Sequence, residues 1–274
     1  MPVTAHPAFD KAAEYLRVKL VKIDLDPNTL RVDLNAVKRA INRNTILVVG
    51  SAPNYPHGVV DDIEGLSQLL ELVDPRHNAP IGRIGLHVDS CLGGFVLPWA
   101  LREGHYGVPT FDFGVTRVTS ISADTHKYGF APKGTSVLLF RDKSIREHMF
   151  FVATDWPGGV YASPSLAGSR PGALLACTWA VMLYNGDEGY RNSALKIMNT
   201  QQALVKGIQD NEHVTGLRVL GLSTSPVVAF TFNSSTKFDI FKVNDAMARR
   251  HWHLDALQQP SAYVPPPPPP PCCY

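Results

Sequence analysis

The sequence predicts an α/β protein with a mostly parallel sheet flanked by helices, followed by a small, incomplete α+β domain. Two observations lead to this prediction. Short runs rich in β-branched residues alternate with amphipathic runs along residues 7–140, which is the pattern of strands joined by crossover helices. Near the C-terminus, a long helical stretch is followed by two strand-like runs and one helical run. A hydrophobic content of 45% allows a sizeable core.

Periodicity and capping residues place the elements of the first part. Residues 7–16 carry Phe9, Ala12, Ala13 and Leu16 at helical spacing, which indicates one apolar helix face. The other expected elements, in chain order, are a strand over 20–23, a helix over 33–42 capped by Asp33, a strand over 45–49, a helix over 63–73 capped by Asp61, and strands over 83–88, 115–122 and 136–140.

The second part is expected to form helices over residues 171–184 and 188–209, with Pro171 in the first turn. Strands over 217–220 and 226–232 and a helix over 243–250 follow. We therefore predict a major domain over 1–187 and a partial small domain over 188–259. Residues 260–274 are predicted to be a disordered tail, because the seven consecutive prolines at 265–271 form polyproline II and cannot join a packed sheet.

Bulk properties exclude several classes of protein. A net charge of +2 without a cluster of Lys or Arg gives no reason to expect a nucleic-acid partner. No apolar run reaches the roughly 18 residues needed to cross a bilayer, and the first residues do not resemble a signal peptide, so we expect a soluble chain. Four scattered cysteines form neither a disulfide framework nor a zinc motif, which favours a reducing compartment.

Two segments place chemically useful residues at the ends of predicted strands. Asp89 follows the strand over 83–88, and Lys127 follows the strand over 115–122. The carboxyl ends of parallel strands meet at one edge of a sheet, where ligands bind. Pyridoxal 5'-phosphate needs a lysine that bonds to its aldehyde and a carboxylate that keeps its ring nitrogen protonated. The pair therefore predicts a pyridoxal phosphate site.

The surroundings of these two residues add further expectations. Lys127 is expected to be buried beside other cations, which would lower its pKa and leave it nucleophilic. Gly93 and Gly94 would allow the backbone to approach the cofactor closely. Each residue alone has a plainer interpretation: Lys127 as a surface lysine and Asp89 as a turn cap.

Histidines leave a metal site open as an alternative. His57, His87, Asp89 and His126 are imidazole and carboxylate groups that can bind a metal, although their spacing matches no compact metal motif. His87 and Asp89 share one face of their strand if the strand extends that far. We predict no metal and keep this alternative for comparison.

Three further positions are candidates for binding anions or moving protons. Lys133 follows Lys127 in a turn and is either a solvated lysine or a cation near the reacting group. Gly168, Ser169 and Arg170 precede a helix, where backbone N–H groups and the helix dipole favour a phosphate. Tyr161 lies before the same loop and is expected to line the same pocket.

These segments together resemble the sphingosine-1-phosphate lyase family. The likeness rests on the segments Ala5-His6-Pro7-Ala8-Phe9, 87–95, 122–134 and 155–172, and it extends from about residue 5 to about residue 260. That family belongs to the group II decarboxylase branch of pyridoxal-phosphate enzymes. The resemblance therefore implies the aspartate-aminotransferase fold, fold type I of the pyridoxal-phosphate-dependent transferases.

The resemblance implies a role for each matching residue. Lys127 would bond to the cofactor, Asp89 would pair with the ring nitrogen, and His6 would stack on the ring. His126 would lie beside the cofactor, and Ser51 is a further candidate cofactor contact. Lys133 and Tyr161 would take part in catalysis, and Gly168 and Ser169 would bind the cofactor. The substrate phosphate would be bound by Lys133 and Arg170. Tyr161 and the loop over residues 168–170 would reach the neighbouring subunit's site.

The activity implied by the resemblance is cleavage of a phosphorylated long-chain sphingoid base to a fatty aldehyde and phosphoethanolamine. It implies a homodimer with active sites at the interface and a location at the endoplasmic reticulum, facing the cytosol. It also implies a long region before His6 and further small-domain sequence after Pro260, so a truncated chain is expected. Two alternatives stay open: an amino-acid decarboxylase, and an inactive subunit that only dimerises.

Overall fold

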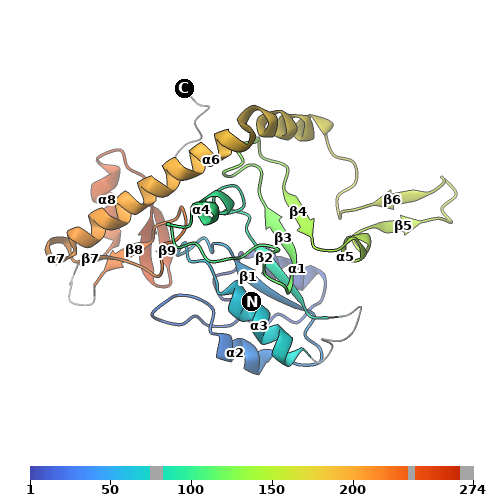
Figure 1. The fold of residues 1–274 in the computed structure, drawn as a ribbon, viewed down its shortest axis with the longest axis horizontal. Coiled ribbons are helices and arrows are strands. Elements are labelled where there is room, and N and C mark those ends of the chain that lie inside the picture. The colour runs from blue at the N-terminus through green and yellow to red at the C-terminus, as the bar shows by residue number, and fades with distance from the viewer. Residues whose placement is uncertain (75–82, 234–237, 266–274) are drawn as a thin grey trace.

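The computed structural model describes residues 1–74, 83–233 and 238–265 of the 274 residues. The predicted α/β class is confirmed by a large sheet with strand order β1-β2-β3-β4 and helices packed around it (Figure 1). β1 (Leu47–Ser51), β2 (Gly85–Asp89) and β3 (Val118–Ala123) are parallel. β4 (Val137–Phe140) pairs with β3 in the antiparallel sense. The large sheet is therefore mostly parallel, as the sequence predicts.

The helices of this part form at or near their predicted positions. α1 (Ala8–Tyr15) and α2 (Leu34–Ala40) precede the sheet, and Asp33 caps α2 by accepting hydrogen bonds from two backbone N–H groups of its first turn. α3 (Ile63–Val73) joins β1 to β2 and packs on β2. The apolar side chains of α3, β2 and β3 belong to one buried cluster, which holds the large sheet against its helices.

Strand register brings three polar residues into one row at the carboxyl end of the large sheet. Ser51 pairs with Asp89, and Asp89 pairs with Ser122. Because β1, β2 and β3 are parallel, these residues lie at the same edge, where open α/β sheets bind ligands. This edge is the place at which the sequence predicts the site.

The long helix α6 (Gly172–Asp210) is broken at Gly186, where the sequence predicts two separate helices. Gly186 has a φ of 57°, in the left-handed region that a residue without a Cβ adopts at low cost. The second part of α6 lies beside α4 (Leu97–Glu103) (Figure 1). It buries Ala194 and Met198 in the core of the large sheet.

A second, antiparallel sheet follows α6, with strand order β7-β8-β10-β9. Its elements are α7 (Glu212–Thr215), β7 (Leu217–Val219), β8 (Phe230–Phe232), α8 (Phe241–Ala248), β9 (Asp255–Gln258) and β10 (Ser261–Val264). The predicted disordered tail from residue 260 is wrong for residues 261–264. β10 lies between β8 and β9, and its Ala262, Tyr263 and Val264 are buried. Residues 266–271 of the predicted polyproline segment lie outside the described residues.

The predicted strand over residues 20–23 is wrong. The segment makes a single parallel bridge between Pro2 and Ile23. The Ile23 N–H donates to the Met1 carbonyl at 2.8 Å, and the Val3 N–H donates to the Ile23 carbonyl at 2.9 Å. The Met1 amino group also donates to the Val21 carbonyl at 3.0 Å, so the pairing consists of a few main-chain hydrogen bonds rather than a strand.

The predicted helix cap at Asp61 is also wrong by one residue. Asp62 caps α3, with Oδ1 accepting a hydrogen bond from the Gly65 N–H at 2.8 Å. Asp61 is fully buried instead, and its carboxylate accepts from the N–H groups of Ser51 (2.8 Å) and Val32 (3.2 Å). Either of two adjacent aspartates is a suitable N-cap residue, so the sequence does not show which of them caps the helix. The fold decides which side chain is buried.

Several short elements have no counterpart in the sequence prediction. They are α4, α5 (Lys143–Glu147) and the hairpin of β5 (Phe151–Ala153) and β6 (Tyr161–Ser163), which projects from the body in Figure 1. Conversely, the strand predicted over 226–232 is shorter, because only Phe230–Phe232 pairs as β8. In the described part of the chain, no helix combines the length and apolar character needed to cross a lipid bilayer.

Candidate active site

Asp89 presents one bonded and one available carboxylate oxygen. Its side chain ends β2 and is 7% exposed. Oδ1 accepts a hydrogen bond from the Cys91 N–H at 3.0 Å and another from Ser122 Oγ at 3.0 Å. Within the described chain, Oδ2 receives no hydrogen bond. An N–H cation placed before Oδ2 can therefore pair with a carboxylate that is already held in position.

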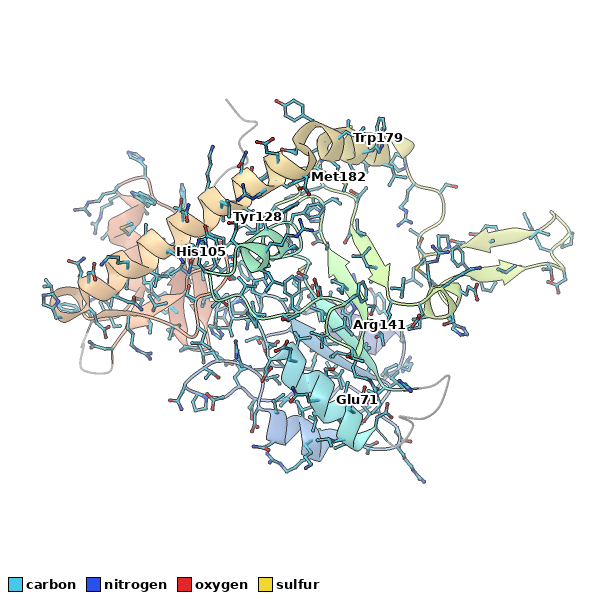
Figure 2. All side chains as sticks on the ribbon, viewed as in Figure 1. Glu71, His105, Tyr128, Arg141, Trp179 and Met182 are labelled. Atoms are coloured by element: carbon cyan, nitrogen blue, oxygen red, sulfur yellow. The ribbon has the colours of Figure 1, made fainter. Side chains whose placement is uncertain are left out.

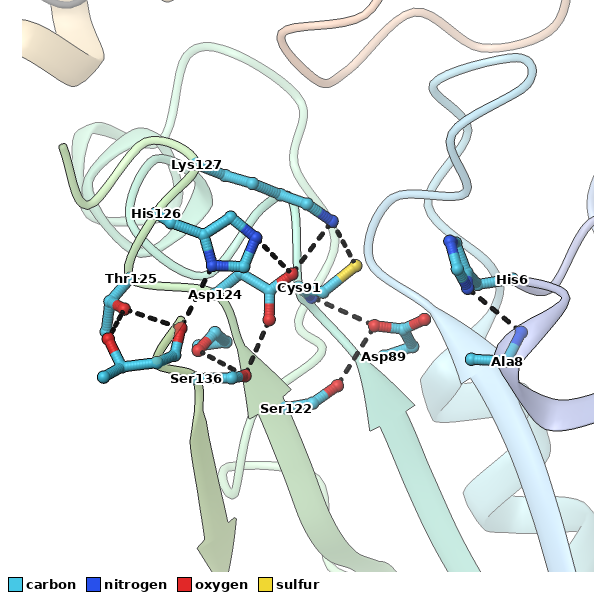
Figure 3. A network of polar contacts seen from close by, with 12 residues as sticks. His6, Ala8, Asp89, Cys91, Ser122, Asp124, Thr125, His126, Lys127 and Ser136 are labelled. Atoms are coloured by element: carbon cyan, nitrogen blue, oxygen red, sulfur yellow. Dashed lines mark hydrogen bonds and ion pairs between the residues drawn. The ribbon is translucent and has the colours of Figure 1, made fainter. Parts of the chain in front are cut away.

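Lys127 lies in the turn after β3 and points toward the same place (Figure 3). Its Nζ donates to Cys91 Sγ at 2.9 Å and lies 3.1 Å from Asp124 Oδ2. Cys91 thus contacts the lysine through its side chain and Asp89 through its backbone. The structure brings Asp89 and Lys127 to one site, with a single residue between them.

The predicted fall in the Lys127 pKa is wrong. Burial lowers the pKa of Lys127, but the hydrogen bond to Cys91 and the negative charge of Asp124 outweigh burial and raise it. Burial raises the pKa of the Cys91 thiol to about 11, and Asp89 adds to this, so the thiol is neutral at pH 7. Cys91 and, to a smaller extent, Asp124 therefore favour the protonated form of Lys127. The described neighbours of the amine are a carboxylate and a thiol rather than the expected cations.

Asp124 joins the lysine to His126. Its Oδ1 accepts a hydrogen bond from Ser136 Oγ at 2.6 Å, and its Oδ2 lies 3.6 Å from His126 Nε2. His126 Nδ1 lies 3.0 Å from the Thr135 carbonyl oxygen. A carbonyl only accepts, so Nδ1 carries the hydrogen in this contact. Figure 3 shows His126 beside the Lys127 side chain, as expected for a residue of the same site.

The Lys127 turn is tied to other elements. Tyr190 of α6 donates its hydroxyl hydrogen bond to the Gly129 carbonyl at 2.9 Å, and the Ala131 N–H donates to the Thr125 carbonyl at 2.9 Å. Phe130, between these anchors, has a φ of 60°. A non-glycine residue in that region persists only where its surroundings hold it, so the turn is a constrained segment.

Gly93 and Gly94 are closely packed against the neighbouring strands, and their approach to the cofactor stays a prediction. A Cβ on Gly93 would lie 2.2 Å from the Ala52 carbonyl oxygen, and one on Gly94 would lie 2.6 Å from the Ala123 Cβ. Both glycines are therefore needed where the segment after β2 crosses the ends of β1 and β3.

The metal alternative finds no support in the described residues, where no three His, Cys, Asp or Glu side chains are grouped to hold an ion. His87 contacts Ser120 Oγ at 2.9 Å and Ser122 Oγ at 3.3 Å, and burial lowers its pKa. His57 is buried in a separate loop, where its backbone N–H donates to Asn54 Oδ1.

His6 and Ser51 border the Asp89 side of the site. His6 is exposed before α1, and its Nδ1 accepts a hydrogen bond from the Ala8 N–H at 3.1 Å. Figure 3 shows it beyond Asp89 as seen from Lys127. Ser51 pairs with Asp89 in the sheet and is buried. Both positions stay candidate cofactor contacts.

The remaining predicted residues do not contact Lys127 or Asp89 in the described chain. Lys133 is exposed in the turn before β4. Tyr161 starts β6 and packs against Phe151 across the projecting hairpin, with ring centroids 6.4 Å apart. Gly168 and Ser169 are exposed, and Arg170 donates only to Ser165 Oγ, at 3.1 Å. Their predicted roles stay predictions.

Sequence reasoning missed four residues of the site. Cys91, Ser122, Asp124 and Tyr190 hold the lysine, the carboxylate or the turn. Cys91 lies in the segment 87–95, and Ser122 and Asp124 lie in the segment 122–134. Their short distance in sequence from Asp89 and Lys127 was therefore a signal that could have found them. Tyr190 had none, because its contact with Gly129 joins segments 61 residues apart.

Comparison with known proteins assigns the family. Residues 3–232 match the pyridoxal-dependent decarboxylase conserved domain. The chain belongs to that family. It is 48% identical over 262 residues to the sphingosine-1-phosphate lyase of Dictyostelium discoideum, covering 96% of this chain and 46% of that protein. For the lyase of Saccharomyces cerevisiae the identity is 46%, over 95% of this chain and 42% of that protein.

Solved structures agree with this membership. The sphingosine-1-phosphate lyase Bpss2021 of Burkholderia pseudomallei K96243 superposes with a TM-score of 0.87 at 44% identity, over 96% of this chain and 56% of that one. Glutamate decarboxylase of Lactobacillus brevis superposes at 0.77 with 19% identity, over 96% of this chain and 59% of that one, which supports the fold alone. The chain spans less than half the length of the Dictyostelium and Saccharomyces lyases. The family is defined by pyridoxal dependence, so pyridoxal phosphate is the cofactor that these residues have to accommodate.

Proposed function

We propose that the protein is a pyridoxal 5'-phosphate-dependent carbon–carbon lyase. Its substrates would be phosphorylated long-chain sphingoid bases, cleaved to a fatty aldehyde and phosphoethanolamine. The observation that carries the proposal is the joining of Asp89 and Lys127 through Cys91 at the carboxyl edge of the sheet. The 48% identity to a sphingosine-1-phosphate lyase supports the choice of reaction.

The site residues fit the cofactor. Bound pyridoxal phosphate supplies an aromatic ring that accepts electrons from a breaking bond. Asp89 would hold the ring nitrogen in its protonated state through Oδ2, since Oδ1 is already engaged by Cys91 and Ser122. Lys127 would bond to the cofactor aldehyde, and His6 and Ser51 would line the ring.

Lys127 has to release a proton before its nitrogen can form that bond. Asp124 Oδ2 lies 3.1 Å from Nζ and His126 Nε2 lies 3.6 Å from the same oxygen, so these two groups are placed to receive it. During cleavage, His126, Lys133 and Tyr161 are the candidates for proton transfer. Lys133 and Arg170 are the cations proposed for the substrate phosphate, with Gly168 and Ser169 beside them.

We further propose a homodimer in which the hairpin and the loop over residues 164–170 reach the partner's site. The support is an apolar surface on β4, the hairpin and the first part of α6, where Figure 2 shows Trp179 and Met182. Its exposed members are Leu138, Leu139, Phe150, Phe151, Val152, Trp156, Val160, Tyr161, Leu166, Leu175, Trp179, Met182, Leu183 and Tyr184. Patches of this kind mark protein interfaces.

The proposal also includes the domain division and the location in the cell. We propose two domains, a major one over residues 1–187 and a partial one from residue 188, supported by the two separate sheets. The second now extends at least to residue 264. We also propose a location at the endoplasmic reticulum, on its cytosolic side, which rests on the resemblance to the eukaryotic lyases.

Product analysis tests the reaction. The purified chain, supplied with pyridoxal phosphate and a phosphorylated sphingoid base, should release a long-chain aldehyde, and Lys127→Ala should abolish the release. Release of carbon dioxide from amino acids instead would favour the decarboxylase. Cofactor uptake without either product, together with dimer formation, would favour the inactive subunit.

A further inference from the structure

Two pairs of polar side chains face each other across β2 and β3. His87 and Asp89 are two residues apart on β2, and Ser120 and Ser122 are two residues apart on β3, so each pair lies on one face of its strand. Strand register places His87 beside Ser120 and Asp89 beside Ser122. The four side chains therefore form a block that ends at the carboxylate proposed for the cofactor.

The hydrogen bonds within this block run in one direction. The Ser122 hydroxyl donates its single hydrogen to Asp89 Oδ1 at 3.0 Å (Figure 3). Toward His87 Nε2, which lies 3.3 Å away, the Ser122 oxygen can therefore only accept. Nε2 consequently carries an imidazole hydrogen.

The other ring nitrogen of His87 is an acceptor. Burial lowers the pKa of His87, so the ring is neutral at pH 7 and holds a single hydrogen, the one on Nε2. The Ser120 hydroxyl then donates to Nδ1 at 2.9 Å. The result is a neutral chain of hydrogen bonds from Ser120 through His87 and Ser122 to the carboxylate of Asp89.

The imidazole is enclosed by its neighbours. His87 is 8% exposed, and the Phe9 ring of α1 packs against it with centroids 5.8 Å apart at an interplanar angle of 60°. In surroundings of this kind, linked hydrogen bonds polarise one another and are stronger than in water. A neutral imidazole also adds no second cation beside Asp89, so the charge of the carboxylate stays available to a cation placed before Oδ2.

We propose that His87 is a positioning residue for the carboxylate that pairs with the cofactor ring. Its Nε2–H directs the Ser122 hydroxyl onto Asp89 Oδ1 and so holds Oδ2 in the orientation that receives the protonated ring nitrogen of pyridoxal phosphate. Without the imidazole, the Ser122 hydroxyl can rotate away, and its hydrogen bond to Oδ1 weakens. The inference rests on the role proposed above for Asp89.

The first measurement tests the direction of the hydrogen bonds in the chain without cofactor. Long-range NMR correlations in the ¹⁵N-labelled chain distinguish the two neutral forms of an imidazole ring, and the signals that vanish in His87→Gln identify His87. The hydrogen should lie on Nε2 in the wild-type chain. A hydrogen on Nδ1, or a charged ring at neutral pH, would overturn the proposal, even where a variant fails to fold.

The second measurement is the affinity for pyridoxal phosphate, followed by absorbance. Ser122→Ala should weaken binding about tenfold, since a hydrogen bond to a charged group is lost, and His87→Leu should weaken it about fivefold. His87→Gln places an amide N–H near the position of Nε2–H and should recover most of that loss. His213→Leu, at an exposed histidine of α7, is the control and should bind as wild type does.

A double variant separates positioning from general destabilisation. Because His87 acts through Ser122, adding His87→Leu to Ser122→Ala should weaken binding by no more than about twofold further. If His87 only supported the fold, its full loss would appear in both backgrounds. Circular dichroism and thermal melting confirm that each variant folds.

Asp89→Ala distinguishes a failure of this inference from a failure of the proposed function. If Asp89→Ala binds pyridoxal phosphate as tightly as wild type, the role of Asp89 is wrong and both proposals are overturned. If Asp89→Ala weakens binding while His87→Leu does not, or if the losses from His87→Leu and Ser122→Ala add in full, only the positioning role of His87 is overturned.

Discussion

Cys91 contacts both Asp89 and Lys127 and therefore links the two sides of the site. Its N–H fixes Asp89 and its thiol accepts the Lys127 hydrogen bond at 2.9 Å. The thiol is neutral at pH 7, because burial raises its pKa to about 11, so it positions the amine without contributing charge. Cys91 and, after it, Asp124 favour the protonated form of Lys127.

Replacing Asp124 with Asn should lower the pKa of Lys127. The substitution removes the negative charge 3.1 Å from Nζ, and burial then acts with less opposition. The lysine titration can be followed by NMR after isotopic labelling, in the chain without cofactor. Asp210→Asn, which removes the carboxylate paired with Lys206 at the end of α6, is the matched control and should leave the Lys127 titration in place. An unchanged titration in Asp124→Asn would mean that another group sets the protonation of Lys127.

Asp61 predicts a pH effect on stability. Burial raises its pKa from 3.8 to about 6, so between these values the folded state binds more protons than the unfolded state. The free energy of unfolding therefore falls as the pH rises through this window, by up to about 3 kcal/mol. Asp61→Asn should lose this part of the pH dependence. Urea unfolding of both proteins between pH 4 and pH 7 checks it, and parallel curves would contradict it.

Among the elements, the Lys127 turn depends on α6 for its shape. Tyr190 reaches from α6 to the Gly129 carbonyl, and Phe130 keeps its left-handed conformation between the two anchors of the turn. The break at Gly186 sets the direction of the helical segment that carries Tyr190. A helix outside the sheet thus positions the Lys127 turn.

Tyr190→Phe should weaken the turn. It leaves the buried Gly129 carbonyl without its partner, which costs about 1 kcal/mol of stability, and up to about 3 kcal/mol if no water replaces the hydroxyl. Affinity for pyridoxal phosphate, followed by absorbance, should fall with it. Tyr15→Phe, at an exposed tyrosine of α1 outside the proposed dimer surface, is the control and should change neither quantity. Equal stability and affinity in both variants would show that the contact is not needed.

The sequence predicts an element well where the signal is local. Periodicity located α1 and α3, and the side chain of Asp33 located the start of α2. It failed where the outcome depends on distant residues. Asp61 and Asp62 are alike locally, and only burial against Ser51 and Val32 separates them.

The same limit applies to the site. Asp89 and Lys127 could be predicted from strand ends alone, because parallel strands share one edge. The Lys127 pKa could not, since it depends on Asp124 and Cys91 at distances that only the fold sets. β10 was missed because the adjacent proline run masked a short buried strand.

At the scale of the whole molecule, the chain leaves apolar surface open in two regions. One is a groove beside β1, and the other covers β4, the hairpin and the start of α6. Leu138 and Leu139 are neighbours on β4 with side chains on opposite faces, and both are exposed. Exposed apolar surface of this extent is typical of protein interfaces.

Charging the second region should separate the proposed dimer. Trp179→Glu places a carboxylate in its apolar surface, and burial of an unpaired charge is costly, so the dimer fraction measured by analytical ultracentrifugation should drop at least tenfold. Leu72→Glu introduces the same charge at an exposed leucine of α3, outside this surface, and should leave the dimer intact. A Trp179→Glu protein that sediments as wild type would place the interface elsewhere.

The most direct test concerns the covalent partner of the cofactor. The chain is incubated with pyridoxal phosphate, reduced with borohydride, digested and mapped by mass spectrometry. One phosphopyridoxyl group on Lys127 is the predicted result, with no label at that level on Lys133 and none in Lys127→Ala. Label spread over several lysines, or retained in full by Lys127→Ala, would contradict the assignment of this site.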